Sequence, residues 1–263
     1  MALLLTVVFF EVCSFFVLGR LRLVLWRGRI EGHQNNAAMP VRSLPTEPHP
    51  RVITPPGRSV VNFYSGAGGT AHRFSNFSYC PEGVLYKGRV YPTAEHAYVA
   101  QKYRGPTQQR FAVGGDLTRW ASMRLFVRPK RGETPEDHGA RVSAKIAHWS
   151  KKGNLGVLAK MAGNPAHAKH AGLPPPKKVR QGIFYKIARS KYTRDPALAA
   201  LLLATGDAHL IEFARGARAR EQRGGEPERW AALVDKDGRI WGDNRMGLVL
   251  MLLREHLNLN ASL

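Results

Sequence analysis

Three short segments of this chain carry side chains that can do chemistry together. Aromatic faces can stack on a planar group, amides can hydrogen-bond to it, and a carboxylate can move a proton. The segments are R-F-S-N-F (73–77), Y-P-T-A-E-H-A-Y-V-A-Q-K (91–102) and W-G-D-N-R-M-G-L-V-L-M-L-L-R (241–254). Taken singly, each also has a purely structural explanation as core aromatics, a helix-dipole carboxylate or a helix cap.

Glu95 is the first candidate for a reacting group. Thr93 can cap a helix over residues 94–103, with Glu95 in its first turn. The positive end of that helix favours the ionised carboxylate, which is the form that a general base or an electrostatic stabiliser needs. Lys102 follows seven residues later, two turns on and on the same helix face. Asp243 is the second candidate carboxylate.

The surrounding pattern predicts an α+β fold, a mostly helical single domain with short antiparallel strands and hairpins. Strand-like segments lie at 60–64 and 210–213, and hairpins are expected at 84–91, turning at Lys87-Gly88, and at 232–241, turning at Asp237-Gly238. Further helices are expected near 140–148, 165–171, 179–192, 196–205 and 247–257. The last of these is apolar on most faces and should be buried, whereas 215–229 reads as a polar loop.

Several familiar sites are excluded. G-A-G-G-T-A (66–71) fits the dinucleotide fingerprint formally, but no helix pattern follows it and no acidic residue ends a second strand at the expected spacing. His167 and His170 have no cysteine or carboxylate at a metal-ligand spacing. There is no phosphate-binding P-loop and no G-x-S-x-G nucleophile motif. Two cysteines, Cys13 and Cys80, are too few for a disulfide framework.

Together the three segments resemble a known family. F-S-N-F, Y-P-T-A-E-H-A-Y-x-A-Q-K, L-L-A-T-G-x-x-x-L-I-E and W-G-D-N-R-M-G-x-x-L-M-x-x-R occur in the order typical of the NADAR (YbiA-like) family. The resemblance runs over roughly 62–256, loosely in the middle third. The helix around Glu95 and the W-G-D segment are its most diagnostic parts.

The resemblance implies an N-glycosidase. The leading expectation is hydrolysis of the N-glycosidic bond of a phosphoribosylated or ADP-ribosylated small molecule, of the kind found among riboflavin-pathway intermediates. Two alternatives stay open: an ADP-ribosyl hydrolase acting on modified guanine in nucleic acid, and a non-catalytic basic module that binds nucleic acid. The chemistry requires no metal or redox cofactor.

The resemblance and the chemistry of the bond together suggest roles for the site residues. Cleaving a ribosyl C–N bond builds positive charge on the sugar, which a carboxylate can stabilise while it orients or deprotonates water. Glu95 and Asp243 are therefore the expected catalytic residues. Trp241 offers a flat face for the base, with Phe74 or Phe77 as the opposite wall. The other expected substrate-binding residues are Asn76, His96, Lys102, Asn244 and Arg245.

Two departures from the family pattern affect the expected substrate. The family usually has a glycine-rich stretch after the W-G element, but here Asp243 runs straight into N-R-M-G (244–247). The connection over 213–240 is also longer than in bacterial members, and the basic stretch around 120–160 looks like an insertion. The loop over the ligand is therefore reshaped, so the substrate cannot be transferred from the family.

Charge is the dominant bulk property. The net charge is +21, and residues 101–190 hold 19 Lys and Arg against 4 Asp and Glu, a net of +15. Such a field attracts nucleic acid, phosphorylated metabolites or an anionic membrane, although a solvated basic face would look the same.

The domain should begin near residue 59 and end near 258. Residues 33–58 are proline-rich and read as an extended linker. Residues 1–32 begin with an apolar run over 2–18, at the lower edge of a membrane-spanning length, followed by four arginines. The segment is expected to be a membrane anchor or an organelle-targeting segment. If it inserts, its arginines keep the domain on the cytoplasmic side.

Overall fold

The computed structural model describes residues 59–64, 69–180 and 182–261. The apolar segment 1–32 and the linker 33–58 lie outside the described residues, as does most of the glycine-rich turn at 66–71. The part of the chain that is described contains no helix long and apolar enough to span a bilayer.

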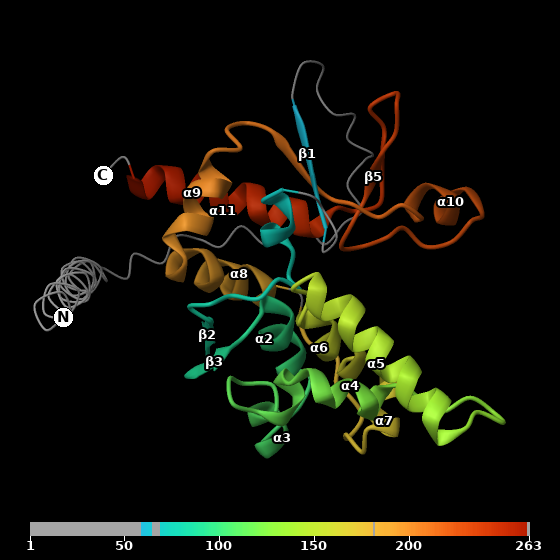
Figure 1. Cartoon of the computed structure of the whole chain (residues 1–263). Coiled ribbons are helices and arrows are strands. Elements are labelled where there is room, and N and C mark those ends of the chain that lie inside the picture. Colours follow the sequence, from blue (N-terminus) through green and yellow to red (C-terminus); the bar gives the residue numbers. More distant parts are fainter. Residues whose placement is uncertain (1–58, 65–68, 181, 262–263) are drawn as a thin grey trace, which may run out of the picture. The chain divides into compact units, whose positions relative to one another are not determined.

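The strands are short and pair two by two (Figure 1). They are β1 (Val60–Phe63), β2 (Val84–Tyr86), β3 (Arg89–Tyr91), β4 (His209–Glu212), β5 (Leu233–Val234) and β6 (Ile240–Trp241). β2 with β3 and β5 with β6 form the two expected antiparallel hairpins. The first turns through Lys87 and Gly88, both at positive φ (48° and 72°), which is the backbone that a tight two-residue hairpin needs.

Helices make up about half of the domain, which confirms the α+β fold class. They are α2 (Ala94–Ala100), α3 (Pro106–Gln109), α4 (Met123–Phe126), α5 (Pro135–Lys151), α6 (Gly156–Ala162), α7 (Pro165–His170), α8 (Ile183–Arg194), α9 (Pro196–Leu203), α10 (Ala217–Gln222) and α11 (Arg245–Ala261), with short 3-10 turns at Ala71–Phe74, Asp116–Thr118 and Trp120–Ser122. Each expected helix is present. The polar loop expected at 215–229 also contains α10, whose sequence A-R-A-R-E-Q consists of good helix formers.

The pairing of β1 with β4 differs from the expected antiparallel arrangement. The two strands run parallel, with Val60 opposite His209 and Phe63 opposite Glu212. Parallel strands need a crossover connection, and here nearly the whole domain forms it. The alternation of side chains in two separate short strands carries no information on their relative direction, so the sequence left this pairing open.

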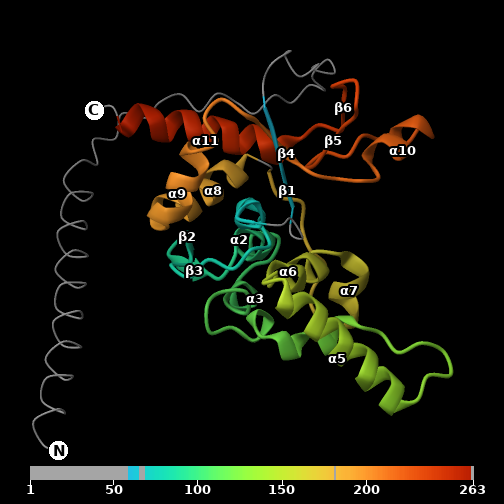
Figure 2. The ribbon, with the colours of Figure 1, turned by 45° about the horizontal axis from the view of Figure 1, so that its top comes forward.

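Helix α2 lies at the centre of the core. It packs against α6 on one side and α8 on the other, and α11 packs across β4, α8 and α9 (Figures 1 and 2). Phe63, Tyr91, Val99, Phe184 and Leu250 are fully or almost fully buried in the resulting cluster. Each such side chain contributes about 1.5–3 kcal/mol by leaving water. Because α8 packs against both α2 and α11, and α11 packs on β4, the core links α2 to β4 through these helices.

The basic stretch 120–160 has a small core of its own. Met123, Val127, Val142 and Leu158 are buried together, with Trp149 packed against them. Helix α5 therefore lies on α4 and α6 through an apolar stripe, while its remaining faces carry charged residues toward solvent.

Candidate functional site

The first turn of α2 is tied to the segment 73–77. The Thr93 hydroxyl accepts the backbone N–H of His96 at 3.1 Å and caps the helix as expected. The backbone N–H of Glu95 donates to the carbonyl of Asn76 at 3.1 Å. Two of the three segments singled out in the sequence are thus joined by a main-chain hydrogen bond at Glu95.

Glu95 is partly buried, and this changes the expected state of its carboxyl group. Burial raises the pKa of Glu95 to about 7, although the positive charges of Lys102 and Lys160 act in the opposite direction. The helix N-terminus had been expected to favour the ionised form. In the structure the loss of water around the carboxyl group outweighs that effect, so Glu95 exchanges a proton near neutral pH.

A second glutamate lies beside Glu95. Glu212 is the last residue of β4, and its pKa is raised to about 8, first by burial and then by the negative charge of Glu95. Lys160 on α6 lowers the pKa of both glutamates. Glu212 is the glutamate of the L-I-E motif, and the residue pattern alone did not mark it as a site residue. We call Glu95, Glu212 and Lys160 the carboxylate cluster.

Aromatic rings line the α2 side of the cluster. Tyr98 stands one turn after Glu95, and the charge of Glu95 adds to burial in raising the pKa of Tyr98. Its ring centroid lies 5.9 Å from that of Trp230 and 5.5 Å from that of Phe184. The ammonium group of Lys102 lies 5.5 Å from the Tyr98 centroid. The helix was expected to continue to residue 103, but α2 ends at Ala100, so Lys102 follows the helix instead of lying on its face. No sequence signal pointed to Trp230.

Asn76 and Phe77 flank the cluster on its other side. Asn76 is 7% exposed, and within the described residues its side-chain oxygen has no hydrogen-bond partner. The Lys191 ammonium, itself buried, donates to the carbonyls of Arg73 and Ser75 at 2.7 and 2.9 Å and holds this segment in place. A buried acceptor without a partner is costly, so its oxygen is suited to receive a donor from a ligand.

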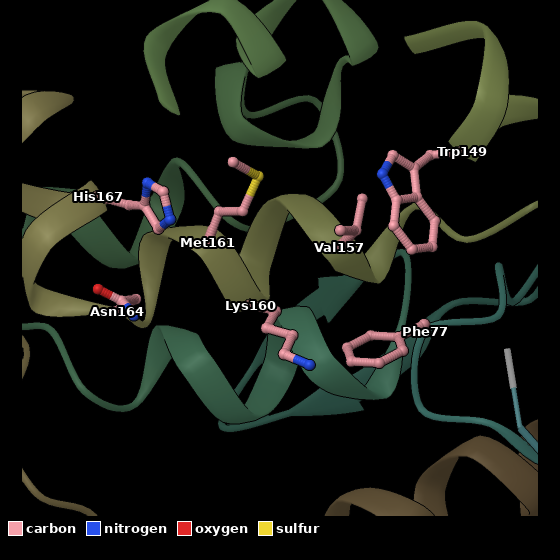
Figure 3. Close-up of a pocket in the computed structure, with 7 residues that line it drawn as sticks. All are labelled: Phe77, Trp149, Val157, Lys160, Met161, Asn164 and His167. Carbon is pink, nitrogen blue, oxygen red and sulfur yellow. The ribbon is translucent and has the colours of Figure 1, made fainter. Parts of the chain in front are cut away.

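Phe77 joins the cluster to a groove along α6 (Figure 3). The ammonium of Lys160 lies 5.4 Å from the Phe77 ring centroid. The carbonyl of Phe77 accepts the backbone N–H of Gly156 at 3.1 Å, and a Cβ at Gly156 would lie 2.5 Å from the Phe77 Cα. The glycine therefore lets α6 approach Phe77 closely.

Two of the expected substrate-binding residues lie in the core instead. Phe74 is 3% exposed and packs edge-on against Phe63 at 6.1 Å between centroids. His96 is fully buried; its Nδ1 pairs with the Thr93 hydroxyl at 2.8 Å and its Nε2 with the carbonyl of Leu117 at 3.4 Å. Burial lowers the pKa of His96 to about 4, so the ring is neutral and structural. Both an apolar side chain and a hydrogen-bonded polar side chain can be buried in a core. The sequence alone did not distinguish Phe74 and His96 from residues that bind substrate.

The W-G-D-N-R segment is held together by its own contacts. The Trp241 indole N–H donates to Asp235 at 2.9 Å, and the guanidinium groups of Arg218 and Arg239 both lie 5.7 Å from its ring. The Asp243 carboxylate pairs with Arg245 at 3.1 Å. The rings described next to Glu95 are those of Tyr98 and Trp230, and Glu212 is the carboxyl group whose pKa the charge of Glu95 raises.

Asn244 also has a role that differs from the expected one. Its side-chain oxygen accepts the backbone N–H of Glu212 at 3.1 Å, and its side-chain nitrogen donates to the carbonyl of Leu210 at 2.8 Å. Both ends of the amide are thereby used by β4. Asn244 acts on the site indirectly, by setting the strand that carries Glu212.

The described residues contain no group of three or more histidine, cysteine or acidic side chains arranged to hold a metal ion. The site has instead two carboxyl groups that titrate near neutral pH, two ammonium groups and several aromatic faces. Carboxyl groups that titrate near neutral pH can donate or accept a proton during a reaction.

Comparison with known proteins adds the family. No family model matches the chain. A solved structure, the NMR structure of the Escherichia coli protein YbiA, is 23% identical and covers 85% of this chain and 95% of that chain, with a TM-score of 0.44. Among curated proteins, N-glycosidase YbiA of Shigella boydii serotype 4 (strain Sb227) is 26% identical over 199 residues, which are 76% of this chain and 89% of the relative.

N-glycosidase YbiA of Escherichia coli (strain K12) is 25% identical over 199 residues, with the same coverage. These two relatives support a glycosidase-type hydrolase in general. The chain is similar to YbiA-like proteins over three quarters of its length.

Proposed function

We propose that this protein is an N-glycosidase that hydrolyses the bond between a ribosyl carbon and the nitrogen of a base, with Glu95 and Glu212 as its acid and base. One observation carries the proposal. Two glutamates from segments more than a hundred residues apart lie together, and each has its pKa raised to near neutrality, to about 7 and about 8. Paired carboxyl groups of this kind divide the roles of acid and base between them.

The reaction needs one proton on the pair. The protonated carboxyl group, Glu212 by its higher pKa, donates a proton to the base nitrogen as the C–N bond breaks. The ionised carboxylate of Glu95 stabilises the positive charge on the sugar and takes a proton from the water that forms the new C–O bond. The products are the free base and the ribosyl compound with a hydroxyl group, and the cluster is left with one proton, exchanged between its two members.

The ammonium groups of Lys102 and Lys160 favour a substrate that carries phosphate. Both are close enough to Glu95 to lower its pKa. A cation near the reacting sugar can bind a phosphate ester as a point charge. We therefore propose a phosphoribosylated or ADP-ribosylated small molecule as the substrate, of the type produced among riboflavin-pathway intermediates.

The test is turnover by the full-length protein. It should be incubated with phosphoribosylamino-pyrimidines, ADP-ribose, NAD and ADP-ribosylated guanosine, and the free base should be measured by mass spectrometry. Glu95→Gln and Glu212→Gln should each abolish the release of base, whereas Glu136→Gln, an exposed glutamate on α5, should not alter it. The proposal is wrong if the wild-type protein releases no base from any of these compounds, or if both cluster variants retain the wild-type rate.

A second candidate, an ADP-ribosyl hydrolase acting on guanine in nucleic acid, is favoured by an exposed basic run. All four of its side chains are exposed: Arg124 lies on α4, and Arg128, Lys130 and Arg131 lie between α4 and α5. Contacts of such side chains with phosphates hold a polymer without reading its sequence. This function predicts that affinity for DNA falls steeply with salt and that modified guanine in DNA is a better substrate than the free nucleoside. Equal turnover of modified guanine in DNA and of the free nucleoside would instead favour the small-molecule function.

A further inference from the structure

The groove along α6 has the size of a small-molecule site and lies next to the carboxylate cluster. It has a volume of about 350 Å³ and is lined by Phe77, Trp149, Val157, Lys160, Met161, Asn164 and His167. This volume is at the small end of the range for ligand pockets, so it suits one flat ring better than a protein segment. Phe77 and Lys160 belong to both the groove and the surroundings of the cluster.

The groove presents aromatic side chains from two separate elements. Trp149 comes from the end of α5, and Phe77 comes from the segment before β2; Figure 3 shows the two at the same end of the groove. Each ring has a cation nearby, Lys152 at 5.7 Å from Trp149 and Lys160 at 5.4 Å from Phe77. Aromatic side chains stack on heterocycles of any sequence, and adjacent cations favour an electron-rich one.

Asn164 and His167 lie at the other end of the groove (Figure 3). The Asn164 side-chain oxygen accepts the backbone N–H of Ala166 at 2.9 Å, so the amide is oriented with its NH₂ group left as a donor. The Nδ1 of His167 lies 3.1 Å from the carbonyl of Phe126, which can only accept. Nδ1 therefore carries the proton in the neutral ring, and Nε2 is an acceptor.

The donor and the acceptor at one end of the flat apolar groove can together bind one edge of a planar ring. Asn164 can donate to a ring carbonyl, and His167 can accept from the ring N–H next to it. That pairing is complementary to a lactam edge, in which C=O and N–H are adjacent. An amidine edge, with an amino group beside a bare ring nitrogen, meets the same pair when the ring is turned over, so the pair selects an edge on which a donor and an acceptor are adjacent.

We propose that this groove binds the heterocyclic base of the substrate, stacked between Trp149 and Phe77 and held by Asn164 and His167 at an edge with an adjacent donor and acceptor. The assignment of the bound ring as the leaving base rests on the proposed function. The groove meets the cluster at Lys160, whose charge acts on both glutamates. The ammonium group is thus placed to stabilise a base that departs with negative charge.

The experiment measures binding of free bases without relying on turnover. Full-length protein is titrated by calorimetry with hypoxanthine, whose edge has a C=O beside an N–H, and with unsubstituted purine, which lacks the exocyclic group. Trp149→Ala should weaken the binding of hypoxanthine about 10-fold or more, since stacking on an aromatic ring contributes this order of affinity. Lys145→Ala, an exposed change one turn earlier on α5 outside the groove, should have no effect.

Asn164→Asp tests the edge without removing the helix cap. The carboxylate keeps an oxygen acceptor for the Ala166 N–H but loses the NH₂ donor. Its affinity for hypoxanthine should fall about 10-fold, while its melting temperature stays at the wild-type value. Equal binding of purine and hypoxanthine by the wild-type protein would overturn the edge contact with Asn164 and His167, and no saturable binding of either would overturn the subsite.

The subsite and the proposed function can fail separately. If hypoxanthine binds and Trp149→Ala weakens it but no compound is hydrolysed, the groove is a base-binding site and the enzymatic proposal is wrong. If base is released and neither Trp149→Ala nor Asn164→Asp changes KM, the enzyme acts on a base bound elsewhere and the subsite is wrong.

Discussion

Asn244 holds the backbone of Glu212 in place: its side-chain oxygen accepts the Glu212 N–H at 3.1 Å. The amide is almost fully buried, and its residue has a φ of +48°, a left-handed backbone that asparagine tolerates better than most residues. Asn244, which directly precedes α11, thus also orients the strand that ends in Glu212. The W-G-D-N-R-M-G motif therefore contains residues that stabilise the fold as well as residues that can take part in chemistry.

Replacing Asn244 should therefore cost stability and rate together. Asn244→Ala leaves the Leu210 carbonyl and the Glu212 N–H without their partner, which should lower the free energy of unfolding by about 1–3 kcal/mol. Because β4 then loses a restraint next to Glu212, kcat should fall more than KM rises. Urea unfolding and steady-state kinetics check both parts. A wild-type unfolding midpoint in this variant would contradict the role.

Gly247 permits the contact between α11 and β4. A Cβ at this position would lie 2.0 Å from the Leu210 carbonyl oxygen and 2.4 Å from the Asn244 side-chain nitrogen. Both atoms are fixed by hydrogen bonds, so Gly247→Ala should destabilise the domain by about 1–3 kcal/mol. Gly139→Ala on α5 is the matched control, because nothing lies within 4 Å of its added Cβ. The control should gain up to about 1 kcal/mol from helix propensity.

Glu212 should make the domain less stable as the pH rises. Its folded pKa of about 8 lies above its ordinary value of 4.5, so the folded state binds the proton more tightly than the unfolded state. The stabilisation is present below about pH 4.5 and is lost as the pH rises to about 8. Glu212→Gln should flatten this decline and raise the free energy of unfolding at pH 8 by about 1–3 kcal/mol relative to wild type. Parallel pH curves for the two proteins would show that the carboxyl group is not buried as described.

Activity should depend on pH in a bell shape. The mechanism needs one proton on the pair, and the two pKa values are about 7 and about 8. The rate should thus be greatest between these values and fall at lower pH, where both carboxyl groups are protonated, and at higher pH, where both are ionised. Glu95→Gln should reduce kcat about 10²–10⁴-fold with the fold intact by circular dichroism. A rate that is constant from pH 5 to 9 would exclude the pair as acid and base.

The sequence predicted the local elements well. Both hairpins, the cap at Thr93 and the helices at 165–171 and 196–205 follow from turn residues, capping and apolar spacing, all of which act over a few residues. It also predicted Glu95 and Lys102 on one helix face, but α2 ends at Ala100, before Lys102. It did not predict the parallel pairing of β1 with β4, because that depends on contacts between the two ends of the domain.

The candidate site was predicted only in part, for a physical reason. Burial decides whether a polar residue is a ligand or a structural partner, and burial is a tertiary property. Asn244 and His96 have the chemistry of ligands but are used by the backbone and by the core. Glu212, at the end of a strand that looked unremarkable, becomes reactive because water is removed from around it. The sign of the Glu95 shift was missed for the same reason.

The parallel pairing of β1 and β4 affects the stage of synthesis at which the protein can become active. Residues 60–63 and 209–212 pair edge to edge as parallel strands. Asn244, which directly precedes α11, hydrogen-bonds to the second of these strands. When the ribosome has synthesised the chain up to the end of α9, Glu95 is present. Glu212 and Asn244, which holds it in place, have not yet been made. Catalytic competence should therefore arise only once α11 has been made, and a product that ends before Asn244 should keep both glutamates but lack the amide that orients Glu212.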